Sequence, residues 1–219
     1  MNGFEYIARI LKQEDTEWLP CYLSNPIIEA VAREGIRPIA FRHERGAVMA
    51  ADGYSRVSDR KKIAVVAMQS QAGAENSVGG LAQANADNVP ILVLPLGNSL
   101  DRINVRPNFS ATKTWETVVK SAEFITRPDQ VGNAMRRAFH GLRNGRPGPV
   151  VVEMTADVCS QEVPEAAMNF TSARYSRSQP SHTDVQDAAN ALVRASNPLI
   201  WAGAGVLAAG ATEELKQLA

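Results

Sequence analysis

Short, continuous apolar runs alternate along this chain with longer segments of helical periodicity. Four runs predict strands, at residues 36–41, 63–68, 91–94 and 150–154. Periodic apolar positions between them predict helices, at residues 25–34, 46–56, 76–86 and 130–142. Unbroken apolar strands are typical of sheets buried on both faces, and strands that alternate with helices form parallel sheets. We therefore predict an α/β fold, a doubly wound parallel sheet with helices on both faces.

The periodicity is interrupted at residues 164–183, which contain Pro164, Pro180 and many Ser, Thr and Gln residues. Such a composition is typical of a linker. Beyond it the pattern predicts a helix at residues 184–196, a strand at 198–202 and a second helix near 213–215. One strand and two helices cannot bury both faces of a sheet. We therefore predict a domain at 1–163, a linker at 164–183 and the incomplete start of a second α/β domain at 184–219.

Composition narrows the classes of partner and compartment. The 219 residues include 23 Lys plus Arg and 23 Asp plus Glu, and 45% are apolar. Nucleic-acid binding needs concentrated positive charge, and no basic stripe is present. No apolar run reaches the length of a membrane span, and the N-terminus lacks the pattern of a signal peptide. The two cysteines, Cys21 and Cys159, fit free thiols in a reducing cytoplasm. We expect a cytoplasmic protein with a small-molecule substrate and neither nucleic acid nor membrane as partner.

Glu44 is the strongest candidate for chemistry, because it lies where a predicted strand hands over to a helix. That helix begins with Gly46 and Ala47, so the surroundings of the carboxyl group are small and apolar. Desolvation disfavours the charged form of a carboxyl group, and a Glu in such a place can exchange a proton with a bound ligand. A Glu in a first helical turn can instead simply complement the helix dipole. The spacing alone leaves both interpretations open.

Five segments in the same order resemble thiamine diphosphate enzymes of the acetolactate synthase, benzoylformate decarboxylase and pyruvate decarboxylase type. They are the motif at residues 42–56, Pro20, residues 73–76, residues 84–94 and residues 145–150. Their order across residues 15–160 makes the resemblance specific. It implies a pyrimidine-binding domain in which Glu44 is the catalytic residue. It also implies that Pro20, Gly73 and Asn76 contact the cofactor.

The resemblance further implies thiamine diphosphate with Mg²⁺ as cofactor. The family holds the diphosphate and metal through a Gly-Asp-Gly motif, which these 219 residues lack, so that site is expected outside this chain. Glu44 would share a proton with the pyrimidine N1′, and the resulting C2 carbanion would act on a 2-oxo acid or a related acyl donor by decarboxylation or carboligation. The chain is then the N-terminal portion of a lyase or acyl-transferring carboligase, inactive alone. The alternative is a non-catalytic module or one subunit of a split enzyme.

Positions expected to face substrate depart from the family pattern. Many acetolactate synthases have Gly-Pro-Gly where this chain has residues 71–73, Pro-Gly-Gly where it has residues 20–22, and Phe-Gln-Glu near residues 109–111. Benzoylformate decarboxylases have a His where Gln69 stands, and Gln cannot transfer protons as His does. The glutamines are about as easily explained as polar loop residues. The candidate substrate contacts are Cys21, Tyr22, Gln69, Ser70 and Gln71.

No cluster of His, Cys and carboxylate residues with the spacing of metal ligands is present near His43. We interpret His43 as a hydrogen-bonded hinge residue and predict no metal site in this chain. Residues 203–208 fit the pattern G-x-G-x-x-A but lack its downstream acid. Some members of the resembled family bind FAD or an ADP-type nucleotide in this domain, so that ligand stays open.

Small residues from Gly79 to Ala86 predict a smooth helix face, which we expect in a homodimer or higher homo-oligomer. The three tryptophans, Trp18, Trp115 and Trp201, are interpreted as packing residues.

Overall fold

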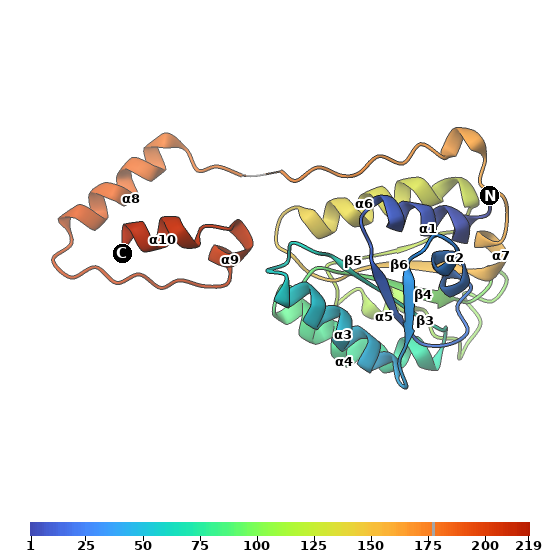
Figure 1. Cartoon of the computed structure of the whole chain (residues 1–219). Helices are drawn as coiled ribbons and strands as arrows, with labels where there is room; N and C mark the ends of the chain where they lie inside the picture. Colours follow the sequence, from blue (N-terminus) through green and yellow to red (C-terminus); the bar gives the residue numbers. More distant parts are fainter. Residues whose placement is uncertain (177) are drawn as a thin grey trace. The chain divides into compact units, whose positions relative to one another are not determined.

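A computed structural model describes residues 1–176 and 178–219 (Figure 1). The chain divides into two compact units, Met1–Tyr175 and Ser176–Ala219. The first unit contains six strands: β1 (Trp18–Cys21), β2 (Arg37–Ala40), β3 (Ala64–Met68), β4 (Ile91–Gly97), β5 (Ser121–Phe124) and β6 (Val150–Thr155). All pair in parallel in the order β2-β1-β3-β4-β6-β5. The predicted α/β class with its parallel sheet is confirmed.

Helices cover both faces of this sheet. Those of the first unit are α1 (Gly3–Gln13), α2 (Ile27–Arg33), α3 (Glu44–Val57), α4 (Ala72–Ala86), α5 (Ala111–Trp115), α6 (Val131–Arg143) and α7 (Ala156–Cys159). One face is packed by α1, α2 and α6, whose core residues include Ile7, Val31 and Phe139. The other is packed by α3, α4 and α5, with Val48, Leu81 and Trp115. Figure 1 shows α1 and α6 above the sheet and α3 and α4 below it.

The three central strands β3, β4 and β6 are buried along most or all of their length. This burial agrees with their unbroken apolar sequences, because each strand has a layer of helices on either side. The strand order reverses at β1 and β3, which are neighbours although β2 lies between them in the sequence. In open α/β sheets the carboxyl ends of the strands at such a point form the binding crevice.

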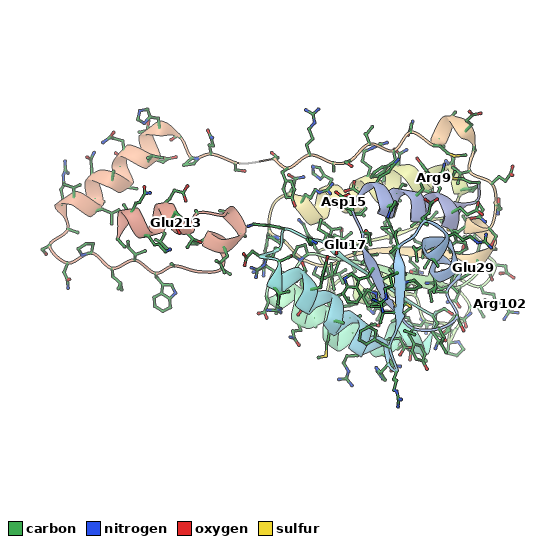
Figure 2. All side chains as sticks on the ribbon, viewed as in Figure 1. Arg9, Asp15, Glu17, Glu29, Arg102 and Glu213 are labelled. Atoms are coloured by element: carbon green, nitrogen blue, oxygen red, sulfur yellow. The ribbon has the colours of Figure 1, made fainter. Side chains whose placement is uncertain are left out.

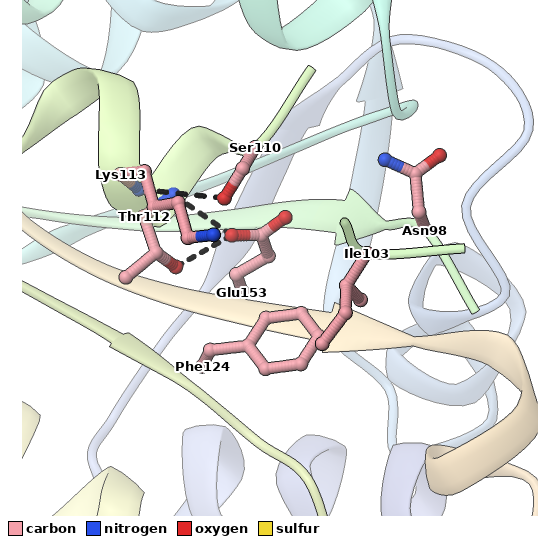
Figure 3. A pocket seen from close by; sticks show the side chains of 7 residues that line it. All are labelled: Asn98, Ile103, Ser110, Thr112, Lys113, Phe124 and Glu153. Carbon is pink, nitrogen blue, oxygen red and sulfur yellow. Dashed lines mark hydrogen bonds between the residues drawn. The ribbon is translucent and has the colours of Figure 1, made fainter. Parts of the chain in front are cut away.

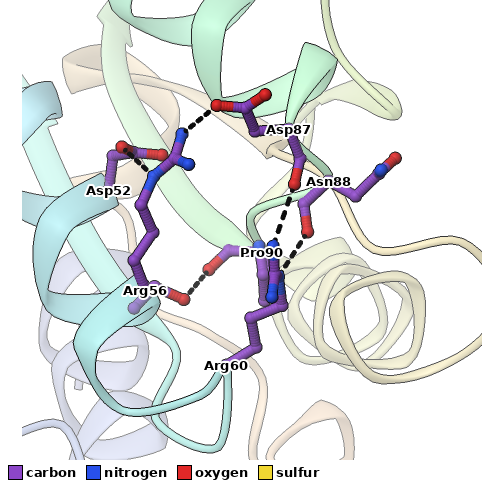
Figure 4. Close-up of polar contacts among 7 residues, drawn as sticks. Asp52, Arg56, Arg60, Asp87, Asn88 and Pro90 are labelled. Carbon is purple, nitrogen blue, oxygen red and sulfur yellow. Dashed lines mark hydrogen bonds and ion pairs between the residues drawn. The ribbon is translucent and has the colours of Figure 1, made fainter. Parts of the chain in front are cut away.

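The opposite end of the unit is held by a polar network (Figure 4). Arg56, at the end of α3, forms ion pairs of 2.7 Å with Asp52 and with Asp87. Arg60 donates hydrogen bonds of 3.1 Å to the backbone oxygens of Asn88 and Asp87. The network therefore joins the ends of α3 and α4, and the second half of the 42–56 motif is structural.

Charged side chains of both signs lie on the outside of the first unit, as Arg9, Glu17 and Glu29 illustrate (Figure 2). This mixture agrees with the balanced composition. No helix of the described residues is long and apolar enough to cross a membrane.

The second unit contains α8 (His182–Arg194), α9 (Gly205–Ala209) and α10 (Thr212–Leu218). The strand predicted at residues 198–202 is wrong, because these residues have no regular structure. A strand needs a neighbouring strand that pairs with its backbone groups. The only regular elements among the described residues of this unit are helices. Trp201 is 93% exposed, so its prediction as a packing residue is also wrong, whereas Trp115 is fully buried.

The first part of the predicted linker packs on the first unit. The amide of Phe170 donates a 3.0 Å hydrogen bond to the Tyr6 hydroxyl, and Phe170 lies edge-on to Phe139. Arg143 donates to the Ala173 carbonyl oxygen at 3.0 Å. Residues 164–175 therefore form a strap across α1 and α6. Residue 177 of the predicted linker lies outside the described residues.

Candidate functional site

Glu44 is the first residue of α3 and is 2% exposed. The backbone at His43 is still extended, and the helix begins at the next residue. The Nδ1 atom of His43 accepts a 3.2 Å hydrogen bond from the Arg45 amide. This bond caps the helix and confirms the interpretation of His43 as a hydrogen-bonded hinge residue. The Glu44 side chain is therefore buried in the first unit, at the carboxyl edge of the sheet.

Helix α4 brings two predicted residues to Glu44. The Asn76 amide Nδ2 donates a 3.1 Å hydrogen bond to Glu44 Oε2. Gly73 lies against the other oxygen, since a Cβ atom built on it would stand 2.9 Å from Glu44 Oε1 and would also overlap the Gln69 side chain. Only a residue without Cβ permits this approach. The structure therefore brings Glu44, Gly73, Asn76 and Gln69 together.

Gln71 has a strained backbone immediately before this helix. Its φ of 56° and ψ of −120° belong to a region that residues with a side chain rarely adopt. Its Nε2 donates to Asn98 Oδ1, and its Oε1 accepts a 3.1 Å hydrogen bond from the Phe109 amide. Asn98 in turn donates to the Phe109 carbonyl oxygen at 2.8 Å. The side chain therefore braces the 98–110 loop, and its contact with substrate stays a prediction.

Replacing Gln71 with Gly should separate the two properties. Gly adopts the observed φ and ψ without strain, which is worth about 1–3 kcal/mol, while the lost hydrogen bonds cost about 0.5–1.5 kcal/mol each. We expect the free energy of unfolding to change by less than about 1 kcal/mol. The Phe109 amide loses its acceptor, so its hydrogen exchange should accelerate at least about tenfold.

Gln71→Ala is the matched control, because Ala keeps the strain and loses the same hydrogen bonds. It should be less stable than Gln71→Gly by about 1–3 kcal/mol and show equally fast exchange at Phe109. Equal stabilities for the two variants would show that the backbone stores no strain. Unchanged exchange in both would show that the loop does not depend on Gln71.

The other predicted site residues lie at the same edge of the sheet and are buried or half-buried: Pro20, Cys21, Tyr22 and Ser70. Pro20 is inside β1 and not in the turn that follows this strand. Its missing N–H is tolerated within β1 because this strand pairs with β3 only at Cys21 and Ala67. Cys21 is buried, and its thiol points to the Ile39 carbonyl oxygen at 3.6 Å. Burial raises the pKa of the Cys21 thiol, so it stays neutral at pH 7.

Tyr22 and Ser70 are half-buried at this edge. Both residues form hydrogen bonds through the backbone. The Tyr22 amide donates a 3.2 Å hydrogen bond to the Ala67 carbonyl oxygen, and the Ser70 carbonyl oxygen accepts one of 3.3 Å from the Gly73 amide. Both side chains therefore stay candidates for substrate contact.

Asn25 is a buried residue of this edge that the sequence analysis assigned to a helix. Its Nδ2 donates to the carbonyl oxygens of Met68 at 2.9 Å and Leu94 at 3.1 Å, and its Oδ1 accepts from the Ile27 amide at 3.2 Å. It therefore ties the end of β3 to the middle of β4, next to the segment that leads into α4. An Asn directly before Pro26 was the available signal, since such pairs start turns.

The small residues of α4 divide between two environments. A Cβ on Gly80 would stand 2.8 Å from Val48 Cγ1, and Ala84 is fully buried. These two residues allow α4 to pack closely on α3 within the chain. Gly79 and Ala86 are exposed. Only some of the small residues from Gly79 to Ala86 therefore lie on the outer face that the sequence predicted.

The chain is similar to a known protein family and to several known proteins. The family described as thiamine pyrophosphate enzyme, N-terminal TPP binding domain, matches residues 1–119. Acetolactate synthase isozyme 3 large subunit of Escherichia coli (strain K12) is 30% identical over 99% of this chain and 39% of its own length. Probable acetolactate synthase large subunit of Methanococcus aeolicus is 31% identical over 100% of this chain and 38% of its own length. The chain thus spans about two fifths of the length of these relatives.

Proposed function

The chain belongs to the family of thiamine pyrophosphate enzymes, and we propose that the carboxyl edge of its first unit binds the aminopyrimidine ring of thiamine diphosphate. The observation that carries the proposal is the Glu44 carboxyl group, which is buried and has Oε1 directed to the bare face of Gly73. A carboxyl group is the partner that a ring nitrogen needs if a proton is to be shared between them.

The residues present fit such a ring. Asn76 holds Glu44 Oε2 by its amide, which fixes the carboxyl plane and leaves Oε1 to the ligand. Gly73 lets this oxygen and the Gln69 side chain approach the backbone of α4 closely, because it carries no side chain. The Glu44 residue is 2% exposed, so the carboxyl group is shielded from bulk water. Glu44 is the residue that holds and returns the proton, and Asn76 is the residue that orients it.

When bound, the cofactor supplies the chemistry that makes or breaks a carbon–carbon bond next to a carbonyl group. We propose a 2-oxo acid or related acyl donor as substrate, and the names of the relatives favour carboligation. The diphosphate and Mg²⁺ are assigned to residues outside this chain, so the chain alone should be inactive. A second copy of the chain is the proposed partner, and Gly79 lies on the exposed side of α4 that such a partner can approach.

Calorimetric titration of the 219-residue chain with thiamine diphosphate, with and without Mg²⁺, tests the half-site. We expect weak binding that Mg²⁺ does not strengthen, because only the pyrimidine contacts are present. Tight binding that requires Mg²⁺ would show that the diphosphate site lies within this chain. Turnover of a 2-oxo acid by the chain alone would contradict the assignment of a half-site.

Gly73→Ala should reduce this affinity at least about tenfold while the fold persists. The added Cβ would stand 2.9 Å from Glu44 Oε1, so either the carboxyl group or the first turn of α4 must move. Gly53→Ala in α3 is the control, since a Cβ there would meet no atom within 4 Å. That variant should bind normally and gain up to about 1 kcal/mol of stability. Equal affinities for the two variants would argue against a ligand at Gly73.

A further inference from the structure

Buried carboxylates differ in whether a cation accompanies them. Asp52 is paired with Arg56 and Glu14 with Arg143. Within the described residues, neither Glu44 nor Glu153 has a Lys, Arg or His nitrogen within 4.0 Å. A buried charge without a partner is costly, so a carboxylate left in this state suggests a ligand. Glu44 is already assigned to the proposed cofactor site, and Glu153 is not.

Glu153 is 2% exposed and lies near the carboxyl end of β6. Its Oε2 accepts a 2.8 Å hydrogen bond from the Thr112 amide and another from the Thr112 hydroxyl. Its Oε1 stands over Gly97, where a Cβ atom would be 2.9 Å away. Both donors are neutral, and both donate to the same oxygen. Oε1 therefore keeps its capacity to accept a hydrogen bond.

A cavity of about 110 Å³ is lined by the Glu153 side chain and lies between β5, β6 and the segment from Asn98 to Lys113 (Figure 3). Figure 3 shows Ile103 and Phe124 on one side of the Glu153 carboxyl group and Thr112 and Lys113 on the other. An apolar cavity of about 150 Å³ accommodates a benzene ring, so this one has room for a short aliphatic group.

Lys113 adds a second charge at the cavity. It is exposed, and its Nζ donates one 3.0 Å hydrogen bond to Asn104 Oδ1, which leaves two N–H donors. The Ser110 hydroxyl also lines the cavity, and its oxygen accepts a 3.4 Å hydrogen bond from the Lys113 amide. The cavity therefore presents an anionic acceptor in its wall, apolar walls and cationic and hydroxyl donors near its rim.

We propose that this cavity binds a small α-amino acid with a short aliphatic side chain. Its ammonium group would meet Glu153 Oε1, its side chain would lie against Ile103 and Phe124, and its carboxylate would face Lys113. An ammonium group brings a positive charge to the buried carboxylate and a hydroxyl does not, so the carboxylate favours the ammonium group. Glu44 is not among the residues that line this cavity, and the inference does not rest on the proposed function.

Three probes test the charge pattern on the full 219-residue chain: 2-aminobutyrate, the equally large 2-hydroxybutyrate, and propylamine, which is 2-aminobutyrate without its carboxylate. Titrations followed by amide chemical shifts should show 2-aminobutyrate binding with Kd on the order of 1 mM or below. Each of the other two lacks one charge and should bind at least about tenfold more weakly. Equal binding of 2-hydroxybutyrate would overturn the ammonium contact. Equal binding of propylamine would overturn the carboxylate contact, and no binding by 2-aminobutyrate would overturn the site.

Variants locate the binding. Glu153→Gln keeps the shape and should weaken 2-aminobutyrate at least about tenfold, and Lys113→Gln should weaken it about threefold. Lys61→Gln, at an exposed position outside the cavity, is the control and should bind normally. If Glu153→Gln does not fold, Lys113→Gln and the cavity-filling Ile103→Trp still decide the question. Wild-type affinity in both would place the ligand elsewhere and contradict the proposal.

Discussion

Glu44→Gln in the complete enzyme should lower turnover by about 10²-fold or more and leave the fold intact. Gln preserves the size of the side chain and can still accept the hydrogen bond from Asn76 Nδ2, which spans 3.1 Å in the native structure. It cannot hold a proton and return it to a ring nitrogen. The expected loss is therefore in the rate and not in the stability. Steady-state kinetics at saturating cofactor, with circular dichroism of both proteins, measures the two separately.

Glu75→Gln provides the matched control for this substitution. Glu75 lies in the first turn of α4, one residue before Asn76, and its side chain is exposed. The same chemical change there should leave turnover within about twofold of the native rate, since exposed charges contribute little. A Glu44→Gln enzyme that retains more than about a tenth of the native rate would refute proton sharing by Glu44. A Glu75 variant with an equal loss would point to a general effect of charge on α4.

The central strands could be predicted because their environment is uniform. β3 and β6 have helices on both faces, so each position is buried and each sequence is a continuous apolar run. The edge strand β5 has an exposed first residue and three half-buried ones, and it contains Glu123, so it carries no such run. Edge strands often have charged residues that prevent further pairing. The absence of a prediction there therefore reflects the position of the strand in the sheet.

Helix α1 was missed although its signal was present. Phe4, Ile7 and Leu11 recur at helical spacing and are buried against the sheet. Asn2 and Glu5 form a capping box, each side chain accepting from the other's backbone amide. This pair marks a helix start by its spacing alone.

The candidate site was predictable in part. Glu44 and Gly73 follow strands that end at one edge, so topology alone brings them together. Glu153 was not recognised because a single carboxylate at the end of an apolar run is ordinary in a strand that reaches the surface. Its burial depends on Thr112, 41 residues away, whose amide and hydroxyl supply the hydrogen bonds. Contacts at that separation leave no local pattern. The role of Gln71 depends in the same way on the distant Asn98 and Phe109.

Arg143→Ala should lower the free energy of unfolding of the first unit by about 3–5 kcal/mol. Arg143 forms an ion pair with Glu14, whose side chain is only 1% exposed. Its guanidinium also lies 5.3 Å from the centre of the Phe139 ring and 5.7 Å from that of Tyr175. Removing the arginine leaves the Glu14 carboxylate buried without a cation, and it releases the strap of residues 164–175. Urea unfolding followed by circular dichroism measures the loss.

Arg137→Ala is the matched control on the same helix. Arg137 pairs with Glu123, but its side chain is 60% exposed, and such surface pairs contribute at most about 1 kcal/mol. The double variant Glu14→Leu with Arg143→Met should recover most of the lost stability, because apolar replacement of a buried ion pair is often neutral. Equal losses in the Arg143 and Arg137 single variants would show that burial of Glu14 carries no cost. A double variant as unstable as Arg143→Ala would place the loss in the hydrogen bond from Arg143 to the Ala173 carbonyl oxygen, and hence in the attachment of the strap.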